Sequence, residues 1–294
     1  MSKPRVREMT PADFPFAVAL TDTERWGFTV EDFERYLALS PRGCFVVEQG
    51  GDRLGMLTTF LYGEVGWIGN VIVSAMARGR GLGGALMDHA IAYLESAGAR
   101  GIRLWAYENT VALYAKYGFA DDGLRSKRWI GFGHTKHVAP SSRPPKGCAV
   151  FPVNALTMKD VYALDRAAFG ADRSRVLERV AVDNPKGGFL ARSTAGSPAG
   201  FLMVKSSPKG CEIGPWVVNA KDAAWAVPCL LEAAVERFAG ESVELGAYTK
   251  RADVQAALAD HGFHAGFETV RMTRGKAPAE DVAAICAIGA LEKG

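Results

Sequence analysis

A basic, glycine-rich turn between a strand and a helix is the part of this sequence best suited to chemistry. The apolar run from Trp67 to Val73 predicts a buried strand, and Ala85 to Leu94 has apolar residues at helical spacing. Between them lie Arg78, Gly79, Arg80, Gly81, Leu82, Gly83 and Gly84. A helix start leaves backbone N–H groups without acceptors beside the positive end of the helix dipole. The four glycines should allow close approach of a ligand and adopt φ angles that other residues avoid, and the arginines add charge, so this turn predicts a phosphate or pyrophosphate site.

The glycine spacing also matches a different phosphate site. Gly79-x-Gly81-x-x-Gly84 has the spacing of a dinucleotide-binding fingerprint. In a Rossmann unit, however, the first glycine follows the strand almost directly, whereas Ser74 to Arg78 intervene here. A dinucleotide-dependent oxidoreductase is therefore kept as an alternative.

A second segment downstream carries a polar residue and a tyrosine in a distinctive pattern. Residues 109 to 119 are N-T-V-A-L-Y-A-K-Y-G-F. Together with R-G-R-G-L-G at residues 78 to 83, this segment resembles the GCN5-related N-acetyltransferases, the GNAT superfamily. In that family [RQ]-x-x-G-x-[GA] forms the acyl-CoA loop between the fourth strand and third helix, and Leu-Tyr-x-x-x-Gly-Phe follows downstream.

The resemblance implies an N-acetyltransferase that moves the acetyl group of acetyl-CoA to a primary amine by direct attack. The acyl-CoA loop, Arg78 to Gly84, would bind the cosubstrate. Main-chain atoms of Val71, Ile72 and Val73 would hold the pantetheine and the thioester oxygen. Asn109 corresponds to a residue that bonds the pantetheine arm, and Tyr114 to the general acid that protonates the departing sulfur.

Residues for the acceptor are less well marked. In the family, two N-terminal helices form a wall of the acceptor site, which makes Trp26, Phe28 and Tyr36 candidates for substrate contact. Aromatic residues at helical spacing can equally be core. The acceptor itself, a small molecule or a peptide amine, is not specified.

The general base is not identified either. Family members use a carboxylate on the central strand or a water chain, and this strand carries Asn70 instead. Glu64, Glu24 and Glu48 are the candidates that we consider. His134 and His137 lack accompanying cysteines or clustered carboxylates, so no metal site is predicted.

The elements that must position these residues follow from pattern. We predict a helix from Pro11 to about Leu20, another from Val30 to before Pro41, and a hairpin over 44–48 and 54–62. The helix after the glycine turn should end at Gly98, and Ile102–Tyr107 should form the next strand, parallel to 67–73. The family splays these two strands, and acyl-CoA lies in the gap.

The chain contains a second copy of this pattern. Ile213–Val218 repeats Ile68–Val73 at an offset of 213 − 68 = 145, and a proline-rich linker at 139–146 separates the copies. We predict domains at 1–140 and 147–294. At that offset the second copy places Ala223 opposite Arg78 and Pro228 opposite Gly83, so the anion site is lost.

The resulting interpretation is an α/β (α+β) chain of two tandem GNAT folds, each with a mixed, splayed sheet flanked by helices. The C-terminal copy is predicted to be degenerate and non-catalytic. The apolar run 282–288 should pack on one copy or across the acceptor cleft. A CoA-binding sensor or scaffold without turnover is the alternative from another functional class.

Composition narrows the functional classes further. A net charge of +3 is too small to indicate nucleic-acid binding, although Arg125, Lys127 and Arg128 cluster and could assist with CoA phosphates. The sequence contains no run of about eighteen apolar residues, so no membrane span is predicted. Five scattered cysteines suggest neither disulfides nor zinc, and a cytoplasmic location is expected. The sequence does not indicate an oligomeric state.

Overall fold

Two compact units make up the chain. The computed structural model describes residues 3–134, 143–207 and 210–294, so 139–142 of the predicted linker and His137 lie outside the described residues. The first unit comprises Met1–Ala120, Met272–Ala277 and Glu292–Gly294, and the second comprises Asp121–Arg271 and Pro278–Leu291. A domain division at the proline-rich segment stays a prediction, because the units follow contacts and not chain order.

The first unit is built on a mixed sheet with the order β1-β2-β3-β4-β5, beyond which lies the end of β12 (His264–Gly275). Neighbouring strands are antiparallel except β4 and β5, which are parallel. The five strands are β1 (Arg5–Glu8), β2 (Cys44–Gln49), β3 (Asp52–Tyr62), β4 (Val65–Val73) and β5 (Gly101–Tyr107). The predicted hairpin and parallel pair are therefore confirmed.

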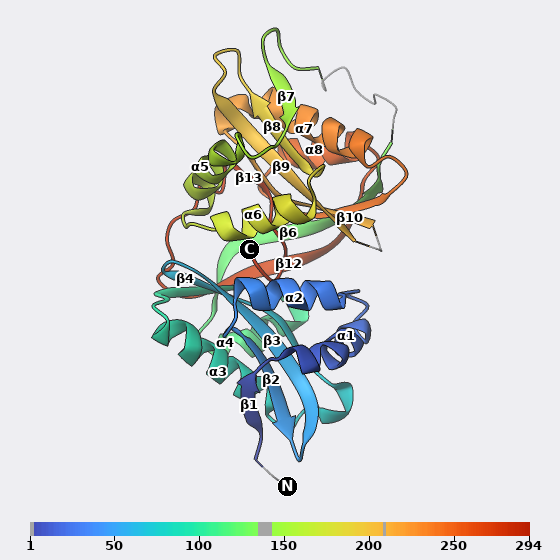
Figure 1. Cartoon of the computed structure of the whole chain (residues 1–294). Coiled ribbons are helices and arrows are strands. Elements are labelled where there is room, and N and C mark those ends of the chain that lie inside the picture. Colours follow the sequence, from blue (N-terminus) through green and yellow to red (C-terminus); the bar gives the residue numbers. More distant parts are fainter. Residues whose placement is uncertain (1–2, 135–142, 208–209) are drawn as a thin grey trace. The chain divides into compact units, whose positions relative to one another are not determined.

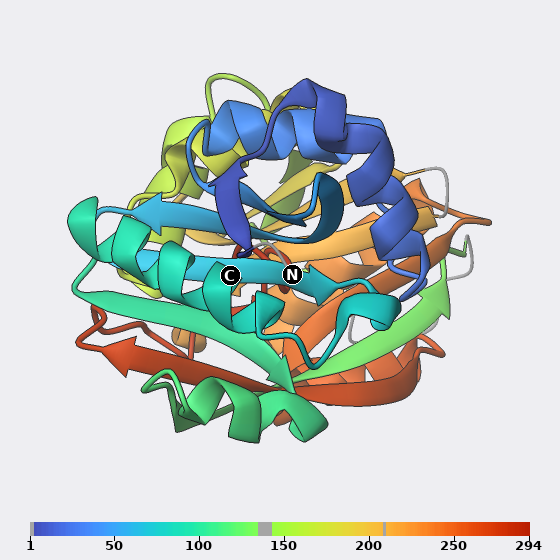
Figure 2. The same cartoon turned by 90° about the horizontal axis from the view of Figure 1, so that it is seen from below.

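Helices cover both faces of this sheet. In Figures 1 and 2, α1 (Phe14–Asp22) and α2 (Val30–Leu39) lie over one face and α3 (Leu82–Ser96) over the other. Thr29 and Asp32 form a capping box at the start of α2, as the sequence indicates. The shorter elements are η1 (Pro11–Asp13), η2 (Ala75–Ala77), η3 (Glu108–Thr110) and α4 (Val111–Ala115).

The parallel pair β4–β5 separates soon after it begins. Registered pairing runs from Val65–Gly101 to Trp67–Arg103, and among the described residues no further pair joins the two strands. The carboxyl-terminal half of β4 therefore faces a gap on the β5 side. This is the splay that the family resemblance predicts.

The second unit repeats this plan. Its sheet runs β12-β6-β11-β13-β10-β9-β8-β7, with β10 and β11 also paired in parallel. The strands are β6 (Ala120–Phe132), β7 (Ala149–Pro152), β8 (Gly188–Arg192), β9 (Pro198–Ser207), β10 (Gly210–Val218), β11 (Ser242–Tyr248) and β13 (Ile285–Ala287). The helical elements are α5 (Met158–Phe169), α6 (Ser174–Asp183), η5 (Ala220–Asp222), α7 (Ala223–Arg237) and α8 (Ala252–Asp260).

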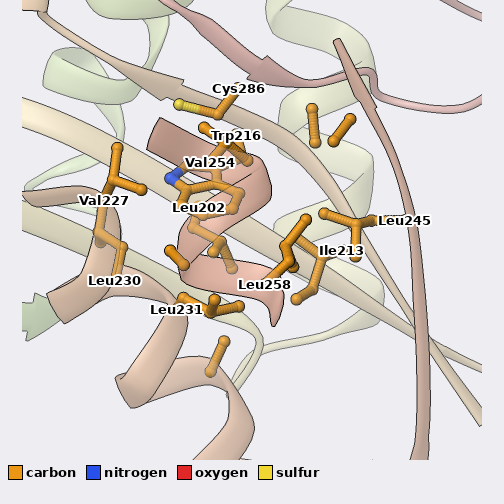
Figure 3. Close-up of a cluster of buried hydrophobic side chains, with 14 of the residues drawn as sticks. Leu202, Ile213, Trp216, Val227, Leu230, Leu231, Leu245, Val254, Leu258 and Cys286 are labelled. Carbon is orange, nitrogen blue, oxygen red and sulfur yellow. The ribbon is translucent and has the colours of Figure 1, made fainter. Parts of the chain in front are cut away.

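Aliphatic side chains around Trp216 form the core of the second unit. Figure 3 shows Trp216 and Leu202 between Leu230 of α7 and Leu245 of β11. All four side chains are fully buried. The run 282–288 contributes β13 to this core, so it packs on one copy, which is one of the two outcomes predicted for it. None of the helices in the described residues has the length and apolar character needed to cross a membrane.

A buried carboxylate ties β1 to the first helical turn and the β2–β3 hairpin. Asp13 is fully buried, forms ion pairs at 2.7 Å with both Arg7 and Arg53, and accepts a hydrogen bond from Thr10 N at 2.8 Å. Burial alone would raise the pKa of Asp13, but the bonds from Arg7 and Thr10 outweigh it and lower the pKa to about 2.

We expect Asp13→Asn to lower the free energy of unfolding by roughly 2 kcal/mol at pH 7. Because the pKa of Asp13 is lowered, its contribution is complete above about pH 4 and is lost as the pH falls towards 2. Urea unfolding of wild type and variant between pH 7 and 2 measures this. Asp52→Asn, at the exposed first residue of β3, is the control. A difference that stays constant down to pH 2 would contradict the assignment.

Candidate active site

A bulge interrupts β4 where it leaves β5. Met56 pairs with Ile72 and Thr58 with Gly69, so Leu57 alone opposes both Asn70 and Val71. Asn70 adopts φ 52°, a left-handed conformation that asparagine tolerates better than most residues, and its Nδ2 donates to Thr58 Oγ1 at 3.2 Å. Beyond the bulge Ile72 and Val73 pair with Met56 and Gly55 of β3. Their other edge, towards β5, has no registered strand partner among the described residues, and this is where the sequence predicts pantetheine contacts.

The glycine-rich turn follows η2 and begins α3. Gly79 and Gly81 both have φ 78°, and a Cβ at either position would meet nothing within 4 Å. These glycines are therefore required for backbone conformation and not for space. Gly81 is the N-cap of α3, and the first bond from the turn into the helix is Ala85 N to Gly81 O, at 3.0 Å. The amides of Leu82, Gly83 and Gly84 thus precede any intrahelical donor, as an anion site requires.

Gly83 and Gly84 have a different role from the one predicted. Both lie inside α3 with ordinary helical conformation, so the expectation of unusual φ angles there is wrong. A Cβ on Gly84 would lie 2.8 Å from the Tyr117 hydroxyl, which shows that Gly84 makes room for that ring. A Cβ on Gly83 would only touch Val73, at an ordinary 3.7 Å.

The two arginines of the turn are exposed and held by neighbouring oxygens. Arg78 donates from Nε to Val73 O at 3.1 Å and pairs through Nη2 with Glu24 Oε1 at 2.5 Å. Arg80 donates to Met76 O at 3.0 Å. Two arginines therefore precede the start of α3, and Glu24, one of the candidate bases, is engaged with Arg78.

Tyr114 and Asn109 lie just after the carboxyl end of β5. Asn109 is exposed on η3, and Tyr114 is buried on α4 with its ring edge-on to Phe119 at 6.4 Å. Burial and the neighbouring Tyr107 raise the pKa of Tyr114 to about 12. The phenol therefore stays protonated at neutral pH and can act as a proton donor.

The candidate acceptor residues form one aromatic group. Phe28 packs edge-on against Trp26 at 6.2 Å and against Tyr36 at 5.9 Å, and Tyr36 packs on Phe60 at 5.8 Å. Trp26 and Phe28 are half-buried, whereas Tyr36 is buried. The group connects α2, the segment before it, and β3, so these residues combine core packing with a partly open edge.

The structure does not bring Glu64 to this region. Glu64 immediately precedes β4, with its side chain exposed and paired with Arg100 at 3.1 Å. The nine residues of β4 separate it from the glycine turn, a span of about 30 Å. Glu48 pairs instead with Arg7. Neither residue is therefore carried into the proposed site.

Some features of the site were not apparent from sequence. Met76, Tyr107 and Leu113, on the three segments that border the gap, are large apolar side chains left exposed. Only one feature of the sequence indicates the positive φ of Asn70, namely an asparagine that follows a glycine inside a strand. The contact of Glu292 with the Tyr36 hydroxyl joins residues 256 positions apart, and no local pattern indicates it.

The second unit lacks the glycine-rich turn and the open gap between parallel strands. Its β10 matches β4 at an offset of 210 − 65 = 145, but α7 matches α3 at 223 − 82 = 141. The four turn residues Arg78 to Gly81 thus have no counterpart, because α7 starts directly after η5. The residue-by-residue replacement predicted at Ala223–Pro228 is wrong, since these residues are helical. Asp222 occupies the helix start and accepts from Trp225 Nε1 at 3.3 Å.

The gap of the second unit is filled by β13. There β10 and β11 pair from Cys211–Val243 to Ile213–Leu245 and then separate. Ala287 of β13 pairs with Trp216 on one side and with Ala247 on the other. Backbone bonds of 2.9 and 3.0 Å, Val218 N to Ala284 O and Ile288 N to Gly246 O, complete the insertion. The basic cluster Arg125, Lys127 and Arg128 also lies in this unit, paired with acidic side chains.

Comparison with known families agrees with this geometry. Residues 6–119 match the model described as "Acetyltransferase (GNAT) family", and residues 161–286 match one described as "Acetyltransferase (GNAT) domain". The chain belongs to the GNAT family of acetyltransferases. This GNAT chain carries two copies of the domain in tandem, and family membership makes it an acyltransferase.

A curated relative of this GNAT chain is known only by its class. It is YitH of Bacillus subtilis (strain 168), an uncharacterized N-acetyltransferase, 27% identical over 174 residues. The match covers 59% of this chain and 58% of the relative.

Solved structures share the fold over the whole length. A putative acetyltransferase from Pyrococcus horikoshii superposes with a TM-score of 0.80 at 24% identity, covering 100% of this GNAT chain and 97% of the other. A GCN5-related N-acetyltransferase from Sphaerobacter thermophilus gives 0.68 at 17%, covering 96% and 98%. A tandem GNAT protein from the clavulanic acid biosynthesis pathway gives 0.67 at 17%, covering 95% and 100%. At these identities the likeness shows the fold.

We expect Tyr114 to remain un-ionised at pH 10, where an unperturbed tyrosine is half ionised. Carbon NMR of tyrosine-labelled protein, with Tyr114→Phe to assign the resonance, checks this. A midpoint near 10 would show that the phenol is solvated and that burial does not control its protonation.

Proposed function

We propose that this chain is an N-acetyltransferase that transfers the acetyl group of acetyl-CoA to a primary amine by direct attack, using the first unit alone. The observation that carries the proposal is the contrast between the two gaps. In the first unit the separated strands β4 and β5 lead to a glycine turn with available amides and two arginines. In the second unit β13 fills the gap and the turn is missing.

The residues of the first unit fit acetyl-CoA. Gly79 and Gly81 leave open space at the start of α3 for a pyrophosphate, and Arg78 and Arg80 supply charge. Main-chain groups of Val71 to Val73 would bond the pantetheine and the thioester oxygen. Asn109 would bond the pantetheine arm.

Tyr114 is the proposed general acid. Its pKa of about 12 exceeds the value of about 8.5 for an ordinary thiol, so giving a proton to the thiolate is uphill in isolation. The proton must therefore be replaced in the same step, and the nitrogen of the new amide, which loses a proton, is the source that the reaction supplies.

The two alternatives now have different standing. The dinucleotide-dependent oxidoreductase loses its basis, because η2 separates β4 from the glycine turn and the chain is a GNAT protein. A CoA-binding sensor without turnover differs from an enzyme only in catalysis, and the Tyr114 experiment below distinguishes them. No disulfide joins the cysteines of the described residues, which supports the proposed cytoplasmic location.

Gly83→Glu should abolish acetyl-CoA binding while leaving the fold intact. A carboxylate is compatible with the first turn of a helix, but it would face the pyrophosphate. Like charges about 4 Å apart repel by about 4 kcal/mol near a protein surface, so affinity should fall by roughly 100-fold or more. Isothermal titration should give one site per chain for the wild type.

Gly83→Ala is the matched control, because its Cβ makes only an ordinary contact with Val73. This variant should retain acetyl-CoA affinity. Two equivalent sites in the wild type, or unchanged affinity in Gly83→Glu, would show that the ligand binds elsewhere.

Tyr114→Phe should lower kcat by roughly 100-fold or more, the usual scale of general acid catalysis, because only the transferable proton is lost. Acetyl-CoA affinity and melting temperature should barely change, since the ring still packs on Phe119. Thiol release across a panel of primary amines measures the rate, and Tyr93→Phe on α3 is the control. A wild-type rate in Tyr114→Phe would assign the acid to another group.

A further inference from the structure

The last three residues of the chain belong to the first unit and lie on the face of β4 that carries the aromatic group. Tyr62 donates from its hydroxyl to Lys293 O at 3.1 Å. A Cβ on Gly294 would lie 2.5 Å from the Trp67 ring, so the tail packs directly against this strand.

Gly69 makes room for the tail. A Cβ on this residue would lie 2.4 Å from both Cα and Cβ of Glu292, a separation that atoms do not tolerate. Gly69 immediately precedes the bulge at Asn70 and Val71. The backbone of Glu292 is therefore seated beside the point where β4 turns into the gap.

The Glu292 carboxylate is buried and hydrogen-bonded. Its side chain is 9% exposed, Oε1 accepts a bond from the Tyr36 hydroxyl at 3.1 Å, and the Lys293 ammonium pairs with the same oxygen. Burial and the charge of Glu292 raise the pKa of Tyr36, so this phenol donates to the carboxylate and does not compete with it for negative charge.

The polar side chains at the bulge itself cannot take up a proton at neutral pH. Asn70 and Thr58 bond each other, and neither an amide nor a hydroxyl is a useful base. Tyr36 is neutral. Two carboxylates act on Tyr36, those of Glu292 and Asp32. Asp32 is paired with Arg35 at 2.7 Å, and Glu292 with Lys293. Of the two, only Glu292 also packs against β4, through Gly69.

We propose that Glu292 is the general base of the acetyl transfer and the group that holds the acceptor's ammonium. This inference rests on the proposed function. At the bulge β4 itself carries Asn70 and no carboxylate. The C-terminal residues pack on Gly69, next to the bulge, and bring the Glu292 carboxylate to the Tyr36 hydroxyl.

The step balances as follows. The acceptor ammonium gives one proton to Glu292, and the freed lone pair attacks the thioester carbonyl carbon. The C–N bond forms and the C–S bond breaks, with its electron pair leaving on sulfur. Tyr114 gives its proton to the thiolate and regains one from the amide nitrogen. Glu292 then releases the acceptor's proton to solvent.

The same contacts indicate the class of acceptor. The Lys293 ammonium lies 4.9 Å from the centre of the Tyr36 ring, with its side chain 12% exposed. The chain's own lysine thus places an alkylammonium between an aromatic face and a carboxylate, and an acceptor would displace it from this position. We infer that the acceptor is a primary alkylamine, and n-butylamine, which reproduces the end of a lysine side chain, is a suitable probe.

The experiment compares thiol release from acetyl-CoA with n-butylamine in the full-length wild type, Glu292→Gln, Glu292→Ala and a variant ending at Leu291. Glutamine can still accept the Tyr36 bond, so the fold should be kept. We expect kcat to fall roughly 100-fold in Glu292→Gln and in the shortened chain, with acetyl-CoA affinity unchanged. Formate should restore part of the rate in Glu292→Ala, which a structural role would not predict.

Glu64→Gln is the matched control, because it makes the same change at the other end of β4, and it should turn over normally. Turnover at the wild-type rate in Glu292→Gln would show that Glu292 is not the general base and would leave the proposed function intact. A faster rate in the shortened chain would do the same and identify the tail as an inhibitory plug. A wild type that binds no acetyl-CoA and releases no thiol would overturn the proposed function and this inference together.

Discussion

The early separation of two parallel strands is the constraint on which both units depend. Backbone N–H and C=O groups that leave a sheet must find partners, because unpaired buried polar groups are costly. In the first unit β4 separates from β5 after Trp67, and beyond the bulge at Asn70 it stays paired with β3 alone. Those main-chain groups are what a pantetheine arm would bond. The glycine turn and α4 follow the carboxyl ends of the same two strands, beyond the last registered pair.

The second unit meets the same constraint without a ligand. Its strands β10 and β11 also separate after three pairs, but β13 enters and bonds to both. The edges of β10 and β11 are thus hydrogen-bonded within the protein, whereas the first unit has no inserted strand between β4 and β5 among the described residues. Once β13 is in place, a glycine turn at the helix start has no ligand to hold. Its removal and the acidic Asp222 at the start of α7 are consistent with that loss.

Local features were predictable from sequence, and long-range ones were not. The strand before the turn, the positive φ of Gly79 and Gly81, and the caps of α2 and α3 follow from neighbouring residues and held in the structure. A constant offset between the copies hid the four-residue deletion, because alanine-rich helix can be aligned with a loop as easily as with another helix. Glu64 looked suitable by residue type, but strand direction places it at the wrong end of β4. Glu292 could not be found, because its contact with Tyr36 depends on where the chain returns after leaving the second unit.

Neither compact unit is one continuous stretch of the sequence. β6 comes from the first half of the sequence but pairs with β11 over seven residues in the second unit, and Met272–Ala277 returns from the second half to the first. Cleavage in the proline-rich segment would therefore leave two fragments that each lack part of a sheet. The fragments would stay associated through the strand ladder after the covalent connection is lost. Although the two domains are copies of one fold, no single cut in the gene would yield two segments that each encode a complete domain.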